Sequence, residues 1–374
     1  MATRSLTSTI LLGALACGCA SAPAVRPDVP MAVKVTPVPA PTSGGTMLAY
    51  ELYLPRHDAL GLRPTRVEIR ADGAGGPVLK SYEGGELTRF LEPPKEGWPD
   101  VATVLVGVTL PAGQAVPASV HHAVALADGS VATGGAATVG APALAISPPV
   151  RGERWWAANG PSIEPVYHRN AKIPIGPSVY YSERFATDWI QLGPDGLPYR
   201  GDGKRNADWY GYGADLLAVA DGTIVDARDG VPENTPIGGR DIGMTFENLG
   251  GNYVVLDVGD RHDTVAFYAH AIPGSVAVRI GDKVRAGQVL AKLGNSGNSD
   301  APHLHFHLCD GAGPIGKRDE SLFCNGLPYV HPSFVLLGRT APDFGDDGKG
   351  WAPAAPPQPR TGEMPVRNQV VSLP

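Results

Sequence analysis

The chain is poor in charged residues and carries no excess of positive charge. Asp, Glu, Lys and Arg make up 18% of its 374 residues, and the formal net charge is −6. Because a nucleic-acid-binding protein is expected to present a basic face, this balance argues against nucleic acid as a partner. The sequence also lacks a glycine-rich phosphate loop, heptad repeats and, beyond the N-terminus, an apolar run long enough to span a bilayer.

Glycine and proline, in contrast, are abundant, at 48 and 37 residues. They favour short strands joined by many turns, and the length of the chain suffices for two domains. Alternating strand patterns occur at residues 48–54, 66–70, 102–108 and 121–126. We therefore expect an all-β protein, with an antiparallel, immunoglobulin-like β-sandwich at 45–145 and a second β domain at 150–340. Because adjacent residues of a strand point to opposite faces, His121 and His122 are interpreted as structural.

The first 22 residues have the pattern of an export signal. A charged start and a short apolar core are followed by two cysteines among small residues. This arrangement resembles a bacterial lipoprotein cleavage box, with Cys17 as the first choice for the lipidated residue and Cys19 as the second. Ordinary signal cleavage near residues 20–22 is the alternative. We therefore expect an exported protein of the periplasm or cell envelope, with a lipid anchor as its contact with the membrane.

Three further segments have a distinctive composition. Residues 23–44 are rich in Pro, Ala and Val, which suits an extended tether. Residues 190–214 are rich in aromatic side chains and form either a specificity loop or a cover for the sheet edge. Residues 341–374 form a C-terminal tail whose apolar end is expected to pack back on the body as a strand.

Alternating histidines give the most informative pattern of the chain. Residues 302–307 read Pro-His-Leu-His-Phe-His, which is the period-2 pattern of a half-buried strand. His303, His305 and His307 would then share one face of that strand. Imidazole is the commonest metal-binding side chain near neutral pH, so this face is predicted to hold a metal and to place a second histidine beside it.

A catalytic zinc ion needs further ligands, because it typically takes three from the protein and keeps one position for water. Asp188 lies inside an aromatic, strand-like run, where a carboxylate costs free energy unless a partner compensates it. His168 is the only histidine between His122 and Asp188. Each residue alone is a weak signal, and each gains weight from the histidine strand that requires partners.

The segment from about 165 to 308 resembles the lysostaphin-like (LytM-type) zinc metallopeptidases, which hydrolyse peptide bonds in bacterial peptidoglycan. The matching pieces follow the order of the family, and they are His168, Asp188, 217–225, 251–256, 267–270, 278–288 and 294–306. The resemblance implies an antiparallel β-sheet catalytic domain, a zinc cofactor and a peptidoglycan peptide as substrate.

Residue by residue, the resemblance implies that His168, Asp188 and His305 are the zinc ligands. It places His270 and His303 at the catalytic centre as non-ligands. Zinc would lower the pKa of a bound water and polarise the scissile carbonyl. The glutamate base of His-Glu-x-x-His proteases is absent, so the two non-ligand histidines would transfer the proton and stabilise the developing charge.

Two features depart from the family pattern. The family usually has three residues between its first His and its Asp, whereas residues 169–187 intervene here. This gap makes Asp208 or Asp215 an alternative to one ligand of the pair. In addition, His307 stands where the family often has Glu, and no role is assigned to it.

Two cysteines follow directly on the histidine strand. In an exported protein, Cys309 and Cys324 are plausible disulfide partners, and such a bridge would stabilise the protein by roughly 3 kcal/mol on the chain-entropy model. Zinc binding by their thiols is the competing interpretation.

The sequence thus predicts a zinc metalloendopeptidase. Two alternatives from other classes are a non-catalytic cell-wall factor that regulates other hydrolases and a swinging-arm carrier domain. The first would be marked by the loss of zinc ligands, and the second by a modifiable lysine in a hairpin.

Overall fold

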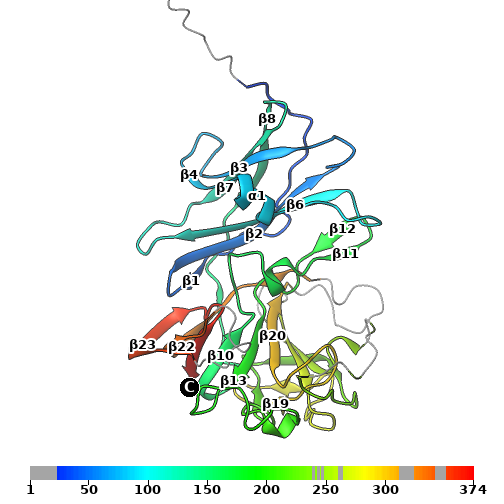
Figure 1. Ribbon diagram of the computed structural model, residues 1–374, viewed down its shortest axis with the longest axis vertical. Helices are drawn as coiled ribbons and strands as arrows, with labels where there is room; N and C mark the ends of the chain where they lie inside the picture. The colour runs from blue at the N-terminus through cyan, green and yellow to red at the C-terminus, as the bar shows by residue number, and fades with distance from the viewer. Residues whose placement is uncertain are drawn as a thin grey trace, which may run out of the picture.

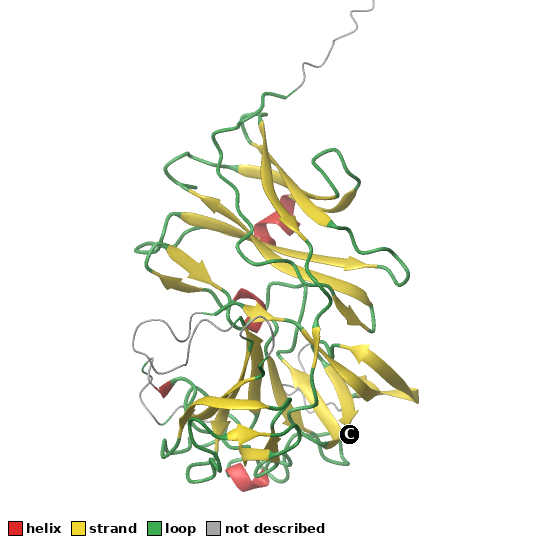
Figure 2. Ribbon diagram, turned by 180° about the vertical axis from the view of Figure 1, so that it is seen from behind, coloured by secondary structure: helices red, strands yellow, loops and turns green. Residues whose placement is uncertain are grey.

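The computed structural model describes residues 23–237, 241, 245, 248–259, 264–310, 324–341 and 351–374. The export signal, including Cys17 and Cys19, lies outside these residues. Within them the chain is nearly all β (Figures 1 and 2), which confirms the predicted fold class. None of the helices described there has the length and apolarity needed to cross a membrane.

The N-terminal half contains two four-stranded antiparallel sheets. The first has the order β1 (Ala40–Thr42), β2 (Gly45–Pro55), β6 (Val101–Leu110) and β5 (Leu91–Glu92). The second has the order β4 (Val78–Glu83), β3 (Pro64–Ala71), β7 (Ser119–Leu126) and β8 (Val131–Thr138). A short helix, α1 (Gly84–Phe90), joins β4 to β5. Residues from both sheets share one hydrophobic core, and the immunoglobulin-like assignment stays a prediction.

Strands β2 and β6 are buried on both faces, because the first sheet lies between the second sheet and the C-terminal half (Figure 1). Leu52 and Val104 point into the sandwich core. On the opposite face, Met47 and Ala49 pack against Phe185 of the C-terminal half. A strand with two buried faces is apolar at most positions, so its sequence does not show which side faces the second half.

Residues 23–44, expected to form an extended tether, instead pack on the sandwich. Val25 and Ala32 form β-bridges to Val131 and Tyr53, and Val29 is buried in the sandwich core. The segment is extended, as its composition indicates, but its apolar side chains and backbone groups find partners on the domain itself.

One large sheet organises the C-terminal half. Its strand order is β18 (Lys283–Val284), β15 (Gly222–Arg228), β16 (Asn252–Asp257), β17 (Val265–Ala271), β20 (Leu304–Cys309), β13 (Thr187–Gln191), β10 (Gly152–Ala158), β24 (Gln369–Leu373), β22 (Tyr329–Arg339) and β23 (Ala352–Glu363). Two short strands extend it: β21 (Gly326–Leu327) pairs with β20, and β9 (Leu144–Ala145) pairs with β22. The core beneath it is built around Trp155, Trp189 and Phe306.

Two strand pairs lie outside the large sheet. Strands β14 (Asp215–Leu217) and β19 (Val289–Lys292) pair below it. Strands β11 (Ile173–Ile175) and β12 (Ser178–Tyr180) form a hairpin on the sandwich side (Figure 1). Two short 3-10 helices, η1 (Tyr167–Asn170) and η2 (Asn206–Asp208), complete the described elements.

Two buried histidines outside the proposed site are held neutral. The Nδ1 atom of His122 donates to the Gly135 carbonyl and its Nε2 accepts from the Tyr50 hydroxyl, each at 2.9 Å. The Nδ1 atom of His331 donates to the carbonyl of Ile146 at 3.1 Å. Burial lowers the pKa of both imidazoles from 6.5 to about 4.

The unfolding free energy of the zinc-free protein is therefore expected to fall as the pH decreases from about 6.5 to about 4. In this pH window His122 and His331 bind a proton in the unfolded chain and stay neutral in the folded protein. Lower pH therefore reduces the unfolding free energy, by about 2–3 kcal/mol per histidine. Denaturant unfolding in EDTA at pH 7.5 and 4.5 measures the difference. His122→Asn should reduce the pH dependence by one histidine's share, and an unchanged dependence would contradict the assignment.

Candidate metal centre

Three neighbouring strands of the large sheet bring the candidate residues together. Strand β13 pairs with β20 so that Asp188 lies opposite His305. On the other side of β20, Ala269 of β17 lies opposite the same His305, which places His270 next to it. Residues from three distant parts of the sequence thus meet at one end of these central strands.

The first candidate ligand comes from outside the sheet. His168 lies in η1, and its Nε2 atom is 3.5 Å from Asp188 Oδ2. His305 Nδ1 lies 3.0 Å from Asp188 Oδ1. One donor atom from each of these three residues lies within 4.8 Å of the other two. Such an arrangement of two imidazoles and one carboxylate fits the donors and the spacing of a zinc site with an open position.

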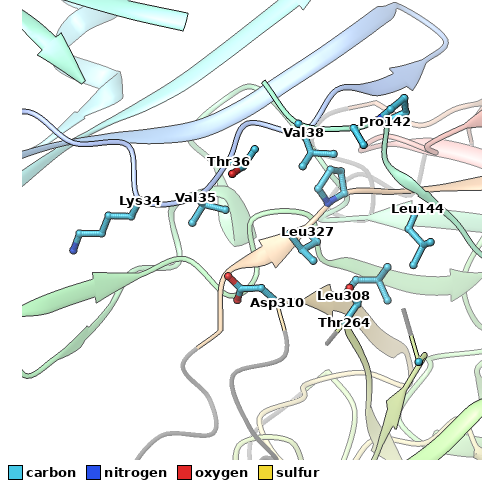
Figure 3. A pocket seen from close by; sticks show the side chains of 14 residues that line it. Lys34, Val35, Thr36, Val38, Pro142, Leu144, Thr264, Leu308, Asp310 and Leu327 are labelled. Atoms are coloured by element: carbon cyan, nitrogen blue, oxygen red, sulfur yellow. The ribbon is translucent and has the colours of Figure 1, made fainter. Parts of the chain in front are cut away.

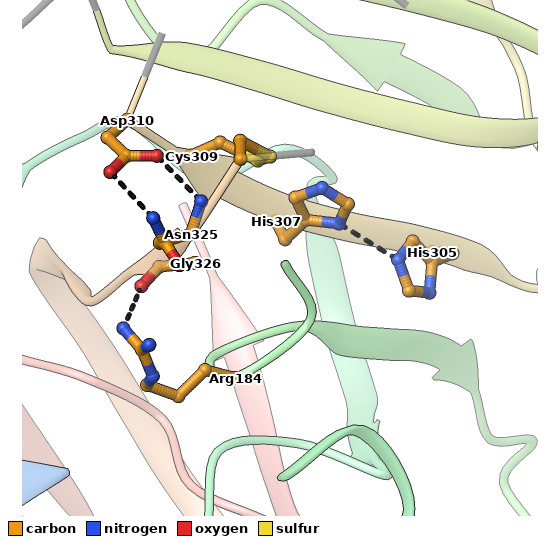
Figure 4. Close-up of a disulfide and its surroundings, with 8 residues drawn as sticks. Arg184, His305, His307, Cys309, Asp310, Asn325 and Gly326 are labelled. Atoms are coloured by element: carbon orange, nitrogen blue, oxygen red, sulfur yellow. Dashed lines mark hydrogen bonds between the residues drawn. A yellow bond between two sulfur atoms is a disulfide. The ribbon is translucent and has the colours of Figure 1, made fainter. Parts of the chain in front are cut away.

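Hydrogen bonds fix which nitrogen of each ring faces the cluster. His168 Nδ1 donates to the carbonyl of Asn159 at 2.9 Å, which leaves Nε2 as the lone-pair nitrogen beside Asp188. The amide of Asn159 donates to Asp188 Oδ2, also at 2.9 Å. On the other ligand ring, His305 Nε2 lies 3.0 Å from His307 Nδ1 (Figure 4), and Nδ1 of His305 faces Asp188. Partners of this kind orient metal-binding histidines in general.

His270 and His303 form a second pair beside the cluster, with ring centres 4.7 Å apart. Their Nδ1 atoms donate to the carbonyls of Ser296 and Ala301, at 2.8 and 2.7 Å. Both Nε2 atoms are therefore unprotonated in the neutral rings, and that of His303 lies 3.5 Å from Asp188 Oδ1. One loop, residues 295–301, thus fixes the tautomer of both rings.

The backbone of His270 has a φ of +69°, which is uncommon for a residue with a side chain. Its N–H donates to the carbonyl of Gly250, and Gly251 and Gly297 pack backbone to backbone beside it. A Cβ on Gly297 would lie 2.3 Å from the Gly251 nitrogen. Strain of this kind persists where surrounding contacts hold it, often at functional sites.

The charges of the cluster are strongly coupled. Burial acts to raise the pKa of the Asp188 carboxyl, but the imidazoles of His168, His303 and His305 lower it well below its usual range. Burial acts to lower the pKa of His305, whereas its hydrogen bond to Asp188 raises it. Burial lowers the pKa of His270 well below its usual value. An ionised buried carboxylate ringed by imidazoles is suited to a cation.

The alternative acids lie elsewhere. Asp208 of η2 accepts hydrogen bonds from Arg205, the residue before the helix, and Asp215 forms an ion pair with Lys292 on the β14–β19 pair. The long gap between His168 and Asp188 contains the β11–β12 hairpin, which turns at residues 176–177. A turn at 182–185 follows the hairpin and leads into β13, which begins at Thr187.

Asn159 and the role of His307 were not predicted from the sequence. Asn159 acts through its backbone carbonyl and through one amide bond to Asp188, and neither contact leaves a sequence pattern. His307, which departs from the family pattern, is the partner of His305 Nε2. Cys309 and Cys324 form a disulfide whose Cα atoms are 5.5 Å apart, beside His307 (Figure 4).

Hydrogen bonds to Glu233 connect the aromatic loop, residues 190–214, with the loop 295–301 that fixes the tautomers of His270 and His303. Tyr212 donates to Glu233 at 2.7 Å, and the other carboxylate oxygen of Glu233 accepts from the N–H of Asn295 at 2.9 Å. Trp209 is buried and packs against the ring of Tyr199, with the two planes tilted by 50°. A direct role of this loop in specificity stays a prediction.

A cavity of about 950 Å³ is separate from the histidines (Figure 3). It lies between the segments 34–38 and 140–144 and the end of β20, where Leu308 lines it. Because Leu308 and His307 point to opposite faces of β20, the cavity opens on the other side of the strand.

His307→Ala is expected to weaken zinc binding about 10- to 100-fold, because the N–H of His305 Nε2 then loses its buried acceptor. His307→Asn is the matched control, since its side-chain oxygen can occupy the position of Nδ1 and retain most of the affinity. Competition with a chromogenic chelator measures both dissociation constants. Equal affinities of His307→Ala and the unsubstituted protein would show that this hydrogen bond does not support the site.

Comparison with known proteins places part of this chain in a known context. Residues 209–316 match Peptidase family M23. Endolysin 2638A of Staphylococcus phage 2638A is 32% identical over 114 residues, which cover 30% of this chain and 20% of the relative. Glycyl-glycine endopeptidase ALE-1 of Staphylococcus capitis is 32% identical over 115 residues, which cover 30% and 26%. The chain thus spans about a fifth to a quarter of the length of these relatives.

Among solved structures, the catalytic domain of the antimicrobial peptidase lysostaphin from Staphylococcus simulans is similar at 22% identity with a TM-score of 0.24. It covers 43% of this chain and 84% of that one. The family match confirms the resemblance to lysostaphin-like peptidases for residues 209–316. His168 and Asp188 precede the matched segment, so the family match does not cover them. Their position next to His305 is an observation of the structure.

Proposed function

We propose that this protein is a zinc-dependent endopeptidase that hydrolyses peptide bonds in bacterial peptidoglycan. The observation that carries the proposal is the convergence of His168 Nε2, an Asp188 oxygen and His305 Nδ1, with the unprotonated Nε2 atoms of a second histidine pair beside them. The family match of residues 209–316 supports the reaction class. Export, with lipid attachment at Cys17 or Cys19, remains part of the proposal.

His168, Asp188 and His305 would hold the metal, since their donor types and spacing fit zinc. When bound, zinc lowers the pKa of a water molecule and polarises a carbonyl group. Asp188 would contribute one negative charge toward that of the cation. The Asn159 and His307 contacts keep the two ligand rings in the orientation that presents Nε2 and Nδ1.

His270 and His303 would carry the proton transfers. In each neutral ring the Nδ1–H is bonded to a carbonyl, so Nε2 can accept the proton of the attacking water. A ring protonated in this way can donate that proton to the leaving amine. The neighbouring ring, when it is protonated at Nε2, can donate a hydrogen bond to the oxygen on which charge develops. Because Ser296 and Ala301 fix both tautomers, these roles need no rotation of either ring.

The test combines metal analysis with a substrate. Purified protein should contain one zinc per chain and release peptides with new amino termini from bacterial sacculi. Mass spectrometry of the products identifies the bond, and sacculi with and without glycine bridges test the type of bond cleaved. EDTA should stop the release and added zinc should restore it. Zinc-loaded protein that frees no amino groups from any sacculus would overturn the proposal.

A further inference from the structure

A buried group of three charges joins the N-terminal sandwich to the proposed metal centre. Glu51 of β2 is 1% exposed, and its two partners, Arg169 and Arg184, are 1% and 2% exposed. Arg169 Nη1 donates to Glu51 Oε1 at 2.6 Å, and Arg184 Nε donates to the same oxygen at 2.8 Å. Arg184 Nη2 donates to Oε2. Both arginines therefore depend on one carboxylate that belongs to the other half of the molecule.

The two arginines are placed next to the candidate ligands. Arg169 follows His168 directly within η1, and Arg184 lies in the turn that leads into β13 and Asp188. Arg169 Nη2 also donates to the carbonyls of Tyr50 and Val106, at 2.9 and 3.0 Å. These bonds fix the backbone of η1 on strands β2 and β6.

Arg184 also contacts the C-terminal half, next to the histidine strand β20. Its Nη1 donates to the carbonyl of Gly326 at 3.0 Å (Figure 4). Strand β21, which contains Gly326, pairs with the end of β20. The carboxylate of Glu51 thus connects the segments that carry His168 and Asp188, and through Arg184 it contacts the strand next to the histidine strand.

The residues between the two ligands pack on the sandwich. Val179 and Tyr181 belong to the sandwich core, and the Tyr181 hydroxyl donates to Glu92 at 2.9 Å. Ile163 rests on Gly107 of β6, where a Cβ would lie 2.7 Å from the Ile163 Cβ. The apolar side chains on both sides of His168 therefore pack against the N-terminal domain.

We propose that the sandwich is an integral part of the metal centre, and that Glu51 is a positioning residue for His168 and Asp188. This inference rests on the proposed function, since it presumes that the cluster binds zinc. Three ions removed from water cost free energy that only good geometry offsets, so a buried network of this kind favours one arrangement of its members over others. Here that arrangement fixes the spacing of two ligands.

Among the described residues, Glu51 is the acid that forms an ion pair with both arginines. Burial acts to raise the pKa of Glu51, but Arg184 and Arg169 lower it below its usual value, so the carboxylate is ionised. Without it, two guanidinium groups would remain buried with carbonyl oxygens as their other partners. Such groups move toward water when their counter-charge is lost, and their movement displaces the segments that carry the ligands.

The test is Glu51→Gln in the full chain, which keeps the volume and removes the charge. Zinc affinity, measured by chelator competition, should fall at least tenfold, and the visible spectrum of the cobalt-substituted protein should change. Glu51→Asp should recover part of both. Val124→Ala is the matched control, because Val124 is fully buried in the second sheet and belongs to the sandwich core. It should lower the melting temperature and leave zinc affinity and the cobalt spectrum unchanged.

If Glu51→Gln does not fold, Arg169→Lys decides, since it keeps the positive charge and removes the forked hydrogen bonds. A several-fold loss of zinc affinity is expected for it. Zinc affinity and a cobalt spectrum like those of the unsubstituted protein, in whichever variant folds, would overturn the inference. Absence of zinc from the unsubstituted protein would instead overturn the proposed function, so the two failures are distinguishable.

Discussion

His305→Ala is expected to contain no zinc after dialysis against dilute metal and to have no measurable activity on sacculi. The side chain is central in the cluster: its Nδ1 lies 3.0 Å from Asp188 Oδ1, and its ring centre is 4.9 Å from that of His168. Without this donor, two protein ligands remain, and these fall short of the three that catalytic zinc sites use. Metal analysis by mass spectrometry, together with the release of new amino groups, measures both effects.

His121→Ala is the control for this experiment, because His121 lies on β7 of the sandwich, away from the cluster. It should keep one zinc per chain and full activity. Full zinc occupancy of His305→Ala would show that His305 is not a ligand, and the assignment of all three ligands would then have to be revised.

His270→Ala and His303→Ala are expected to separate chemistry from metal binding. Each should keep its zinc yet lose on the order of 10²-fold or more in turnover, the scale of a positioned acid–base group. The reason is geometric: their rings lie beside the cluster, and their Nδ1–H groups are committed to Ser296 and Ala301. Rates under saturating substrate, with zinc content measured on the same samples, test this expectation.

The two variants should differ in their pH–rate profiles, since removal of the proton acceptor abolishes the acidic limb, whereas removal of a charge-stabilising donor leaves it in place. Loss of zinc from either variant would make that histidine a ligand and would reverse the roles proposed here. Retention of full activity by both would remove the pair from the mechanism.

The histidine strand could be predicted because its information is local. The alternation of His303, His305 and His307 with apolar residues is enough to place all three on one face. Asp188 and His168 could be proposed only through the resemblance to a family, since nothing in their own neighbourhoods indicates that they meet. Asn159 contributes a backbone carbonyl, a group that every residue possesses, so no pattern could single it out.

The contacts between the two halves could not be predicted from the sequence, for a different reason. Glu51 is a single charged residue in a strand that is apolar from Met47 to Leu54 otherwise, and Arg169 and Arg184 look like ordinary surface charges in the sequence. Their contacts are separated by 118 and 133 residues along the chain. Pairings over such distances depend on how whole domains pack, which periodicity and spacing within one segment do not record.

The central position of strand β24 has a consequence for the order of events during biosynthesis. Strand β10 pairs with β13 on one side and with β24, residues 369–373, on the other. Until residue 373 has emerged from the ribosome, β10 has an unpaired edge two strands away from the histidines, and such edges invite intermolecular association. Strands so far apart in sequence also pair slowly. A ribosome-stalled chain lacking β24 is therefore expected to associate through this edge rather than assemble the histidine centre.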